Sequence, residues 1–177
     1  AVTASPDGSR IYIGGSFNTV NGQTRYNFAA LDASTGALIP GFAPSVGGSG
    51  VYAITAAGTS VYVGGLFTQA NATARKNLAA FSTANGALLP WAPTTDRQVD
   101  AMVMEPGNEK VIVAGRFYQT NDQVQRGLAA LDPRSGAIIT SWLAPKTIVN
   151  GWSSGANDGK AGIFGLNADS SGVYGTG

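Results

Sequence analysis

The sequence predicts an all-β protein built from repeated antiparallel sheets. Three stretches share one pattern at intervals of fifty residues, namely 11–40, 61–90 and 111–140. Within each stretch, short runs of β-branched and aromatic residues alternate with Gly- and Asn-containing turns, and no helical periodicity is visible. A repeat of this length buries its faces only against neighbouring repeats. We therefore expect β-propeller blades of four antiparallel strands each; a β-solenoid, whose coils are usually shorter, is the less favoured alternative.

The second repeat illustrates the expected strands, at 51–57, 60–67, 77–82 and 87–91. The first run alternates apolar residues on one face, and the second is rich in β-branched residues and ends in Gly-Gly. The last two are separated by the turn "TANG", where a glycine supplies the positive φ. The other repeats have "DASTG" and "DPRSG" there, so we expect Asp32 and Asp132 to accept hydrogen bonds from turn amides rather than to act as general acids or bases.

Glycine pairs and aromatic residues recur at fixed places. Glycine inside a strand indicates a bulge or a close backbone approach, which stacked sheets require. We expect the phenylalanine two residues after each pair to be buried between adjacent sheets, and the aromatic residue that closes each repeat to be core as well. The recurring sets are Gly14-Gly15, Gly64-Gly65 and Ala114-Gly115, then Phe17, Phe67 and Phe117, then Phe42, Trp91 and Trp142.

The repeats divide the chain into blades at about 1–42, 51–91 and 99–142, a partial fourth blade at 163–177, and a loop insertion at about 146–162. Three blades and part of a fourth do not close a ring of ordinary size. Open sheet faces at both ends would expose apolar surface. We therefore expect a fragment of a larger propeller, completed by further blades or by another chain.

Composition excludes several classes of function. A hydrophobic fraction of 44% with 12% charged residues indicates a folded domain. The net charge of +1 leaves no electrostatic footprint for nucleic acid, and no apolar run is long enough for membrane insertion. The chain has no cysteine and no histidine, which removes thiol nucleophiles, disulfides, Cys/His zinc sites and imidazole-based triads. We expect no cofactor.

Strand direction places the longer connecting segments at one end of the sheets, at 17–27, 66–77, 117–127 and 143–162. Loops on a rigid scaffold are favoured binding sites. Amide and guanidinium groups suit sugar hydroxyls or carboxylates, although Asn can instead hold the turn and Arg can tether one blade to the next. The candidate ligand-binding residues are Asn21, Asn71, Asn121, Arg25, Arg75, Arg126, Tyr118 and Trp152.

The insertion before the fourth blade breaks the repeat. Trp152 stands there among Gly, Ser and Asn, so we expect it either to contact a partner or to fold over the channel as a plug. Asp158 lies in an Asn-Asp-Gly sequence that has the start of a calcium loop but not its further carboxylates, and it is the one candidate metal ligand.

The segment 7–42, "DGSRIYIGGSFNTVNGQTRYNFAALDASTGALIPGF", resembles the delta-60 repeat, a bacterial β-propeller repeat with a "DG" turn, a "VGGxF" strand, "NG", an Arg and a closing Phe. The resemblance recurs in all three repeats. It implies a propeller in a secreted or cell-surface bacterial protein and supplies no catalytic residues. The strings "AALDASTGALIP" and "AALDPRSGAIITSW" are also similar to the blade hairpin of quinoprotein propellers.

Three functions follow as hypotheses. The favoured one is a non-catalytic binding or surface-display module that recognises protein or glycan (carbohydrate) through the loop-bearing end. The first alternative is a quinoprotein-like or glycan-active enzyme domain, which needs clustered carboxylates or a cofactor. The second alternative is a structural spacer.

Overall fold

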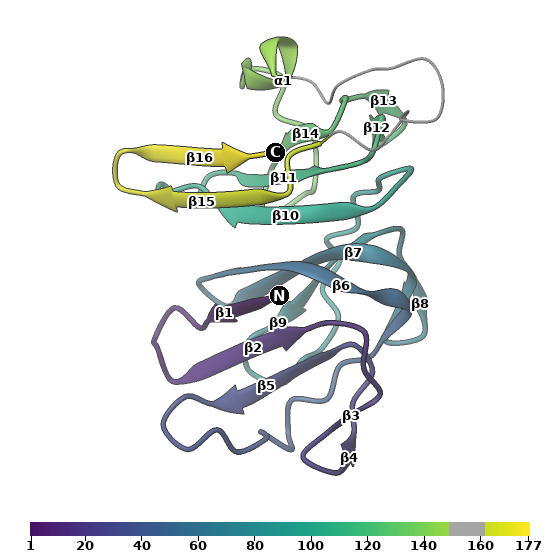
Figure 1. Cartoon of the computed structure of the whole chain (residues 1–177), viewed down its shortest axis with the longest axis vertical. Coiled ribbons are helices and arrows are strands. Elements are labelled where there is room, and N and C mark those ends of the chain that lie inside the picture. Colours follow the sequence, from purple (N-terminus) through teal and green to yellow (C-terminus); the bar gives the residue numbers. More distant parts are fainter. Residues whose placement is uncertain (149–161) are drawn as a thin grey trace.

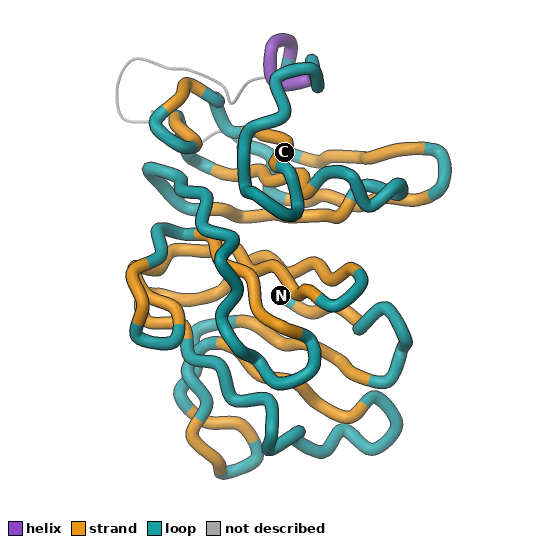
Figure 2. The backbone as a smooth tube through the Cα atoms, turned by 180° about the vertical axis from the view of Figure 1, so that it is seen from behind, coloured by secondary structure: helices purple, strands orange, loops and turns teal. Residues whose placement is uncertain are grey.

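The computed structural model describes residues 1–148 and 162–177, and its sheets stack one above another along the longest axis (Figure 1). Apart from one short helix, every regular element in these ranges is a strand, and the view from behind shows the same layers (Figure 2). The prediction of an all-β protein with antiparallel sheets is confirmed. No helix in the described part of the chain is long and apolar enough to cross a membrane.

Each layer is one antiparallel sheet. Blade 1 contains β1 (Val2–Ala4), β2 (Arg10–Gly14) and β5 (Phe28–Asp32). Blade 2 contains β6 (Val46–Ala57), β7 (Ser60–Ala70) and β9 (Leu78–Ser82). Blade 3 contains β10 (Val99–Met104), β11 (Val111–Gly115) and β14 (Leu128–Leu131). The fourth sheet pairs β15 (Gly165–Asp169) with β16 (Gly172–Thr176). The first strands of consecutive sheets lie beside one another.

The fourth segment of each blade differs from the predicted strand. Only one bridge forms on the outer side of each sheet, at Leu31–Leu38, Phe81–Leu88 and Leu131–Ile138. In blade 2, the carbonyls of Gly86 and Leu89 accept hydrogen bonds from the side chains of Asn71 and Arg75 instead of from a strand. Polar side chains therefore cover the outer edge, which limits its capacity to pair with another strand.

The segments predicted as loops contain small β-hairpins. They are β3 (Thr19–Val20) with β4 (Gln23–Thr24), the end of β7 with β8 (Thr73–Ala74), and β12 (Gln119–Thr120) with β13 (Gln123–Val124). Both central turn residues have positive φ, as a type I′ turn requires: 50° and 75° at Asn21 and Gly22, 45° and 60° at Asn71 and Ala72. We call the end of the stack that carries these hairpins the hairpin end (Figure 1, right). The helix α1 (Ala144–Thr147) also falls in a predicted loop.

The core lies between the sheets rather than within them. Each of three buried clusters combines side chains of two consecutive sheets. Because side chains alternate along a strand, each blade has a back face toward the preceding sheet and a forward face toward the following one. In blade 2 the back face comprises Val61, Val63, Phe67, Ala70 and Phe81, and the forward face comprises Tyr62, Leu78, Ala80 and Trp91.

Two of the three recurring phenylalanines are buried as predicted. Phe67 is 1% exposed and Phe117 is 0% exposed, each between two blades. For Phe17 the prediction is wrong: its ring is partly exposed, because no described sheet lies against the back face of blade 1. The closing aromatics Phe42 and Trp91 are buried, and Trp142 is partly buried against the third cluster.

The glycine pairs have two separate roles. A Cβ on Gly64 would lie 2.6 Å from a Val99 side-chain carbon, so this glycine allows the next blade to approach. A Cβ on Gly65 would lie 2.2 Å from the carbonyl oxygen of Gly50, so the second glycine allows the first strand of its own blade to approach. The register of β6 against β7 shifts nearby, between Val51 and Ala53. The expected bulge and close approach are both confirmed.

Two tyrosines at equivalent positions give a matched test of blade packing. Tyr62 Oη donates to the Pro133 carbonyl of blade 3 at 2.9 Å. Tyr12 Oη is buried without a hydrogen bond, because the matching carbonyl, Thr83, accepts from Arg10. We expect Tyr62→Phe to lower the free energy of unfolding by about 1 kcal/mol and Tyr12→Phe to leave it unchanged or raise it. Urea denaturation measures both, and an equal loss in both variants would contradict the assignment.

Candidate functional site

The recurring asparagines of the hairpin turns hold the scaffold together. Asn71 Oδ1 accepts a hydrogen bond from Ser45 N at 2.8 Å, and its Nδ2 donates to Gly86 O at 3.1 Å. Asn121 repeats both bonds, with Thr94 N at 2.9 Å and Gly136 O at 2.9 Å. Each asparagine therefore links the hairpin tip to the connection that enters its blade. Asn21 has the same turn conformation but is exposed, and the described residues include no counterpart of Ser45.

The candidate arginines are tethers within a blade. Arg25 donates to Thr24 O at 2.7 Å and to Pro40 O at 3.2 Å. Arg75 donates to Ala74 O at 2.9 Å and to Leu89 O at 3.1 Å. Both fix a hairpin to the outer segment of the same blade, so the interpretation that they join one blade to the next is wrong. Arg126 is exposed at the position of Lys76.

A second pair of asparagines, which the sequence interpretation missed, connects the blades. Asn77 is buried, and its φ is 68°. Its Oδ1 accepts from Phe67 N at 3.0 Å, and its Nδ2 donates to Thr95 O and Arg97 O, each at 3.0 Å. Asn27 makes the same kind of bonds to Phe17 N and to Val46 O. Blades 1 and 2 have Asn27 and Asn77 where blade 3 has Gly127. Asn and Gly are the residue types that tolerate positive φ, so this alternation was the signal in the sequence.

The turn aspartates are structural, as predicted. Asp32 Oδ1 accepts from Ser34 Oγ at 2.7 Å and from Thr35 N at 2.8 Å. The hydrogen bond from the Ser34 side chain, followed by those from Thr35, lowers the pKa of Asp32 to about 2. For Asp132, the bond from the Ser135 backbone is the main cause of a lowered pKa. Both groups are anionic at neutral pH and have no proton to donate.

Charged and aromatic residues gather at one place on the hairpin end of blade 3. We call this set the blade-3 cluster; it comprises Asp96, Arg97, Gln98, Asp100, Arg116, Tyr118 and Phe164. It comes from three segments, of which 96–100 and 116–118 are joined by the backbone: Arg116 N donates to Gln98 O at 3.0 Å. Asp96 Oδ1 accepts from Tyr118 N at 2.8 Å and from Gln119 N at 2.9 Å. The candidate residue Tyr118 thus belongs to a site that the other candidates within the described residues do not enter.

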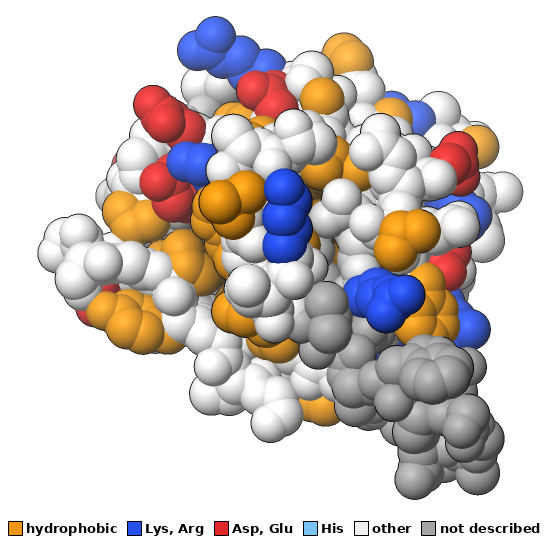
Figure 3. Space-filling view, turned by 90° about the horizontal axis from the view of Figure 1, so that it is seen from above, with side chains coloured by type: hydrophobic (Ala, Val, Ile, Leu, Met, Phe, Trp, Pro, Cys, Tyr) orange, Lys and Arg blue, Asp and Glu red, His pale blue; other side chains and the backbone are white. Residues whose placement is uncertain are grey.

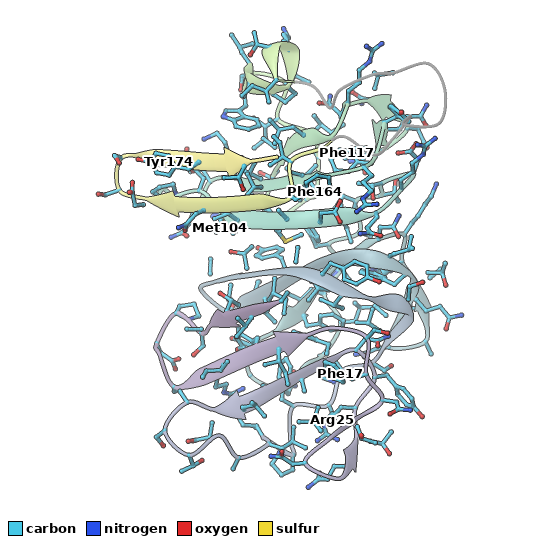
Figure 4. The ribbon with its side chains drawn as sticks, viewed as in Figure 1. Phe17, Arg25, Met104, Phe117, Phe164 and Tyr174 are labelled. Carbon is cyan, nitrogen blue, oxygen red and sulfur yellow. The ribbon has the colours of Figure 1, made fainter. Side chains whose placement is uncertain are left out.

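An ion pair and two cation–π contacts fix the side chains of the cluster relative to one another. Arg116 Nε lies 3.3 Å from Asp100 Oδ2, and the guanidinium carbon lies 5.4 Å from the centre of the Phe164 ring. The guanidinium carbon of Arg97 lies 4.4 Å from the centre of the Tyr118 ring. Both arginines and Phe164 are exposed, and Tyr118 is partly exposed. Figure 4 labels Phe164 near the start of β15, where the chain enters the fourth sheet. The cluster is therefore an ordered surface with two cation–π pairs.

The equivalent positions in the other blades carry different residues. Arg116 corresponds to Ser16 and Leu66, and Tyr118 corresponds to Asn18 and Thr68. Asp100 occupies the β10 bulge at the place where Tyr52 occupies the β6 bulge. Most candidates of the sequence interpretation were residues that recur, whereas Arg116, Tyr118 and Asp100 are departures from the repeat. Those departures were its only signal in the sequence.

Trp152 and Asp158 lie outside the described residues. Among residues 1–148 and 162–177, no group of three or more His, Cys, Asp or Glu side chains is arranged to hold a metal ion.

Residues 6–38 match the model of a family described as a domain of unknown function (DUF5122), beta-propeller. A comparison with curated proteins found no match. The matched residues contain β2 and β5 of blade 1, together with the hairpin β3–β4 and the outer bridge at Leu38. The match over residues 6–38 supports a β-propeller repeat, and the stacked antiparallel sheets show that the chain folds as consecutive blades of this kind.

Proposed function

We propose that this propeller segment is a non-catalytic binding module that recognises a protein partner through the blade-3 cluster. The observation that carries the proposal is the pair of cation–π contacts at this surface, Arg97 with Tyr118 and Arg116 with Phe164. Arg116 and Tyr118 replace the Leu66 and Thr68 of blade 2. Tyr and Arg are enriched among the residues that dominate protein–protein binding energy. Asn71, Asn121, Arg25 and Arg75 are engaged in the scaffold and do not support the wider loop surface as the site.

A protein partner is favoured over a glycan because arginine side chains already lie over the aromatic rings of the cluster. Sugars stack on an open aromatic face, but Arg97 covers one face of Tyr118 and Arg116 lies over the ring of Phe164. The carboxylates also support a non-catalytic role. Asp96 accepts two backbone hydrogen bonds and Asp100 is paired with Arg116, so neither has the free, paired arrangement of a glycosidase acid and base.

The proposal includes a secreted or cell-surface location in a bacterium, as in proteins with the delta-60 repeat. The support is the "GGxF", "NG" and Arg pattern of that repeat in blade 1, which recurs with substitutions in blades 2 and 3: Asn71-Ala72 and Asn121-Asp122 replace "NG", and Ala114 replaces the first Gly. Protease treatment of intact cells that produce the native protein, followed by immunoblotting, tests the location. Loss of the signal is expected, and full protection of a protein that is digested after lysis would contradict it.

Panning of a random-peptide phage library on the chain, with a glycan array in parallel, tests the function. Selected peptides are expected to bind at the blade-3 cluster. Two variants place the blade 2 residue in blade 3, Arg116→Leu and Tyr118→Thr, and each should weaken peptide binding by about tenfold. Arg126→Lys is the matched control. It also replaces a blade 3 residue with its blade 2 equivalent, Lys76, but it lies outside the cluster and should have no effect on peptide binding.

Peptides that bind all three variants equally would overturn the proposed site. Glycans that bind the wild type and lose affinity in Tyr118→Thr would replace the protein partner with a carbohydrate. The absence of any selected peptide or glycan would favour a spacer.

A further inference from the structure

Charged residues are divided unequally between the two ends of the sheets. We call the end opposite the hairpins the turn end, because it carries the turns between the first and second strands of each sheet. Leaving aside α1, the cations of the described hairpin end are Arg25, Arg75, Lys76, Arg97, Arg116 and Arg126, and its acids are Asp96, Asp100 and Asp122. The acids of the described turn end are Asp7, Asp32, Glu105, Glu109, Asp132 and Asp169, and its cations are Arg10, Lys110 and Arg134. The net charge of +1 thus conceals a positive hairpin end and a negative turn end.

Two acids of the hairpin end are engaged, whereas two of its exposed cations form no ion pair. Asp100 is paired with Arg116, and Asp96 accepts two backbone hydrogen bonds. Within the described part of the chain, Lys76 and Arg97 have no acidic partner, and both side chains are exposed. Figure 3 looks down the stack and shows side chains of both signs on the left and on the right, so each end has an excess of one sign rather than a continuous patch.

A hollow at the hairpin end of blade 2 brings two of the cations together. Its volume is about 250 Å³, and none of the described residues that line it is acidic. The lining residues are Thr68, Ala74, Arg75, Lys76, Ala92 and Thr94. The ammonium group of Lys76 and the threonine hydroxyls are hydrogen-bond donors that suit a carboxylate, and the alanines suit the apolar part of a side chain.

The hollow lies beside the blade-3 cluster. The backbone joins Lys76 to the segment that enters blade 3, because Thr95 N donates to Lys76 O at 3.3 Å. Thr94, which lines the hollow, is three residues before Arg97, which lies over the Tyr118 ring. Three residues of extended chain span at most about 10 Å. One short peptide can therefore contact the hollow and the cluster together.

We propose that the partner presents an acidic peptide segment to the hairpin end, with a carboxylate in the hollow beside Lys76 and a neighbouring residue at the blade-3 cluster. The inference rests on the proposed function and names the chemistry of the partner. Opposite charges across an interface speed association, and the negative turn end repels the same segment. A peptide is favoured over nucleic acid because acids interrupt the cations, whereas nucleic-acid affinity depends on many phosphate contacts.

Fluorescence anisotropy with two labelled peptides tests the charge of the partner. The first alternates Glu and Tyr, and the second alternates Lys and Tyr at the same length. The Glu peptide is expected to bind, at least about tenfold more tightly than the Lys peptide, and to lose affinity by about tenfold between 20 and 200 mM salt.

Charge reversal locates the contact. Lys76→Glu should weaken binding of the Glu peptide by about tenfold or more, because it places a like charge in the hollow. The matched control is Arg134→Glu, which makes the same change of charge at an exposed position of the turn end and should alter affinity by less than about twofold. Circular dichroism checks that both variants are folded.

No binding of the Glu peptide, equal affinity for the two peptides, or equal weakening by Lys76→Glu and Arg134→Glu would overturn the acidic partner. Heparin or single-stranded DNA that binds more tightly than the Glu peptide and loses affinity in Lys76→Glu would replace the peptide with another polyanion. Phage-selected peptides without net negative charge that bind Lys76→Glu as tightly as the wild type, yet lose affinity in Arg116→Leu, would overturn this inference and leave the proposed function intact.

Discussion

Phe67→Ala is expected to lower the free energy of unfolding by about 3–5 kcal/mol, as for other large buried side chains. The ring is 1% exposed and lies in the cluster shared by blades 1 and 2, with Phe28, Phe42 and Val51. The loss should therefore weaken the contact between the two blades as well as the packing of blade 2. Chemical denaturation of the wild type and the variant measures the difference.

Phe17→Ala is the matched control, because Phe17 is the equivalent residue of blade 1 and is partly exposed. Its loss is expected to be under about 1 kcal/mol when both proteins are measured at a concentration where the chain is monomeric. Equal effects of the two substitutions would show that Phe67 is not held between blades, and the stacking described above would be wrong.

Asn77→Ala is expected to have the second large effect, about 3 kcal/mol or more. The substitution removes three hydrogen bonds of a buried amide, to Phe67 N, Thr95 O and Arg97 O, and leaves those backbone groups without that partner. It also places alanine at a φ of 68°, a conformation that Gly and Asn tolerate and that costs most other residues about 1–2 kcal/mol. The two contributions act in the same direction.

Asn77→Gly separates the two contributions, since glycine removes the amide without the backbone strain. Blade 3 uses this arrangement: Gly127 has a φ of 81° at the same position. The glycine variant should be more stable than the alanine variant by about 1 kcal/mol and less stable than the wild type. A glycine variant as stable as the wild type would mean that the amide does not hold the connection to blade 3.

Local signals in the sequence accounted for the sheets. The β-branched and aromatic run at 60–67 and the apolar run at 77–82 became strands, and the Gly-Gly pair marked the approach of neighbouring backbones. The hairpins at the hairpin end were missed because their strands are only two residues long, too short for an alternating pattern. The fourth segment was overestimated because a strand needs partners along its length, and here side chains of the hairpin occupy the carbonyls of the outer edge.

The candidate site was harder to predict because it depends on contacts between segments. Asn71 makes the same tethers as Asn121 of blade 3, and Arg75 makes the same tethers as Arg25 of blade 1, so recurrence identified scaffold residues. Arg116 and Asp100 meet only after β10 and β11 pair across a bulge, and Phe164 joins them from the fourth sheet. Tyr118 was selected for its place beside the hairpin, and only the structure placed Arg97 over its ring.

The central claim is that recurring residues build the scaffold and non-recurring residues of blade 3 recognise the partner. Calorimetric titration of a selected peptide into the double variant Arg116→Leu, Tyr118→Thr tests it most directly. Both new residues are those of blade 2, so the melting temperature should stay close to that of the wild type. We predict that peptide affinity falls by about a hundredfold, as expected for the loss of two central interface residues. Unchanged affinity in a folded double variant would contradict the assignment of recognition to blade 3.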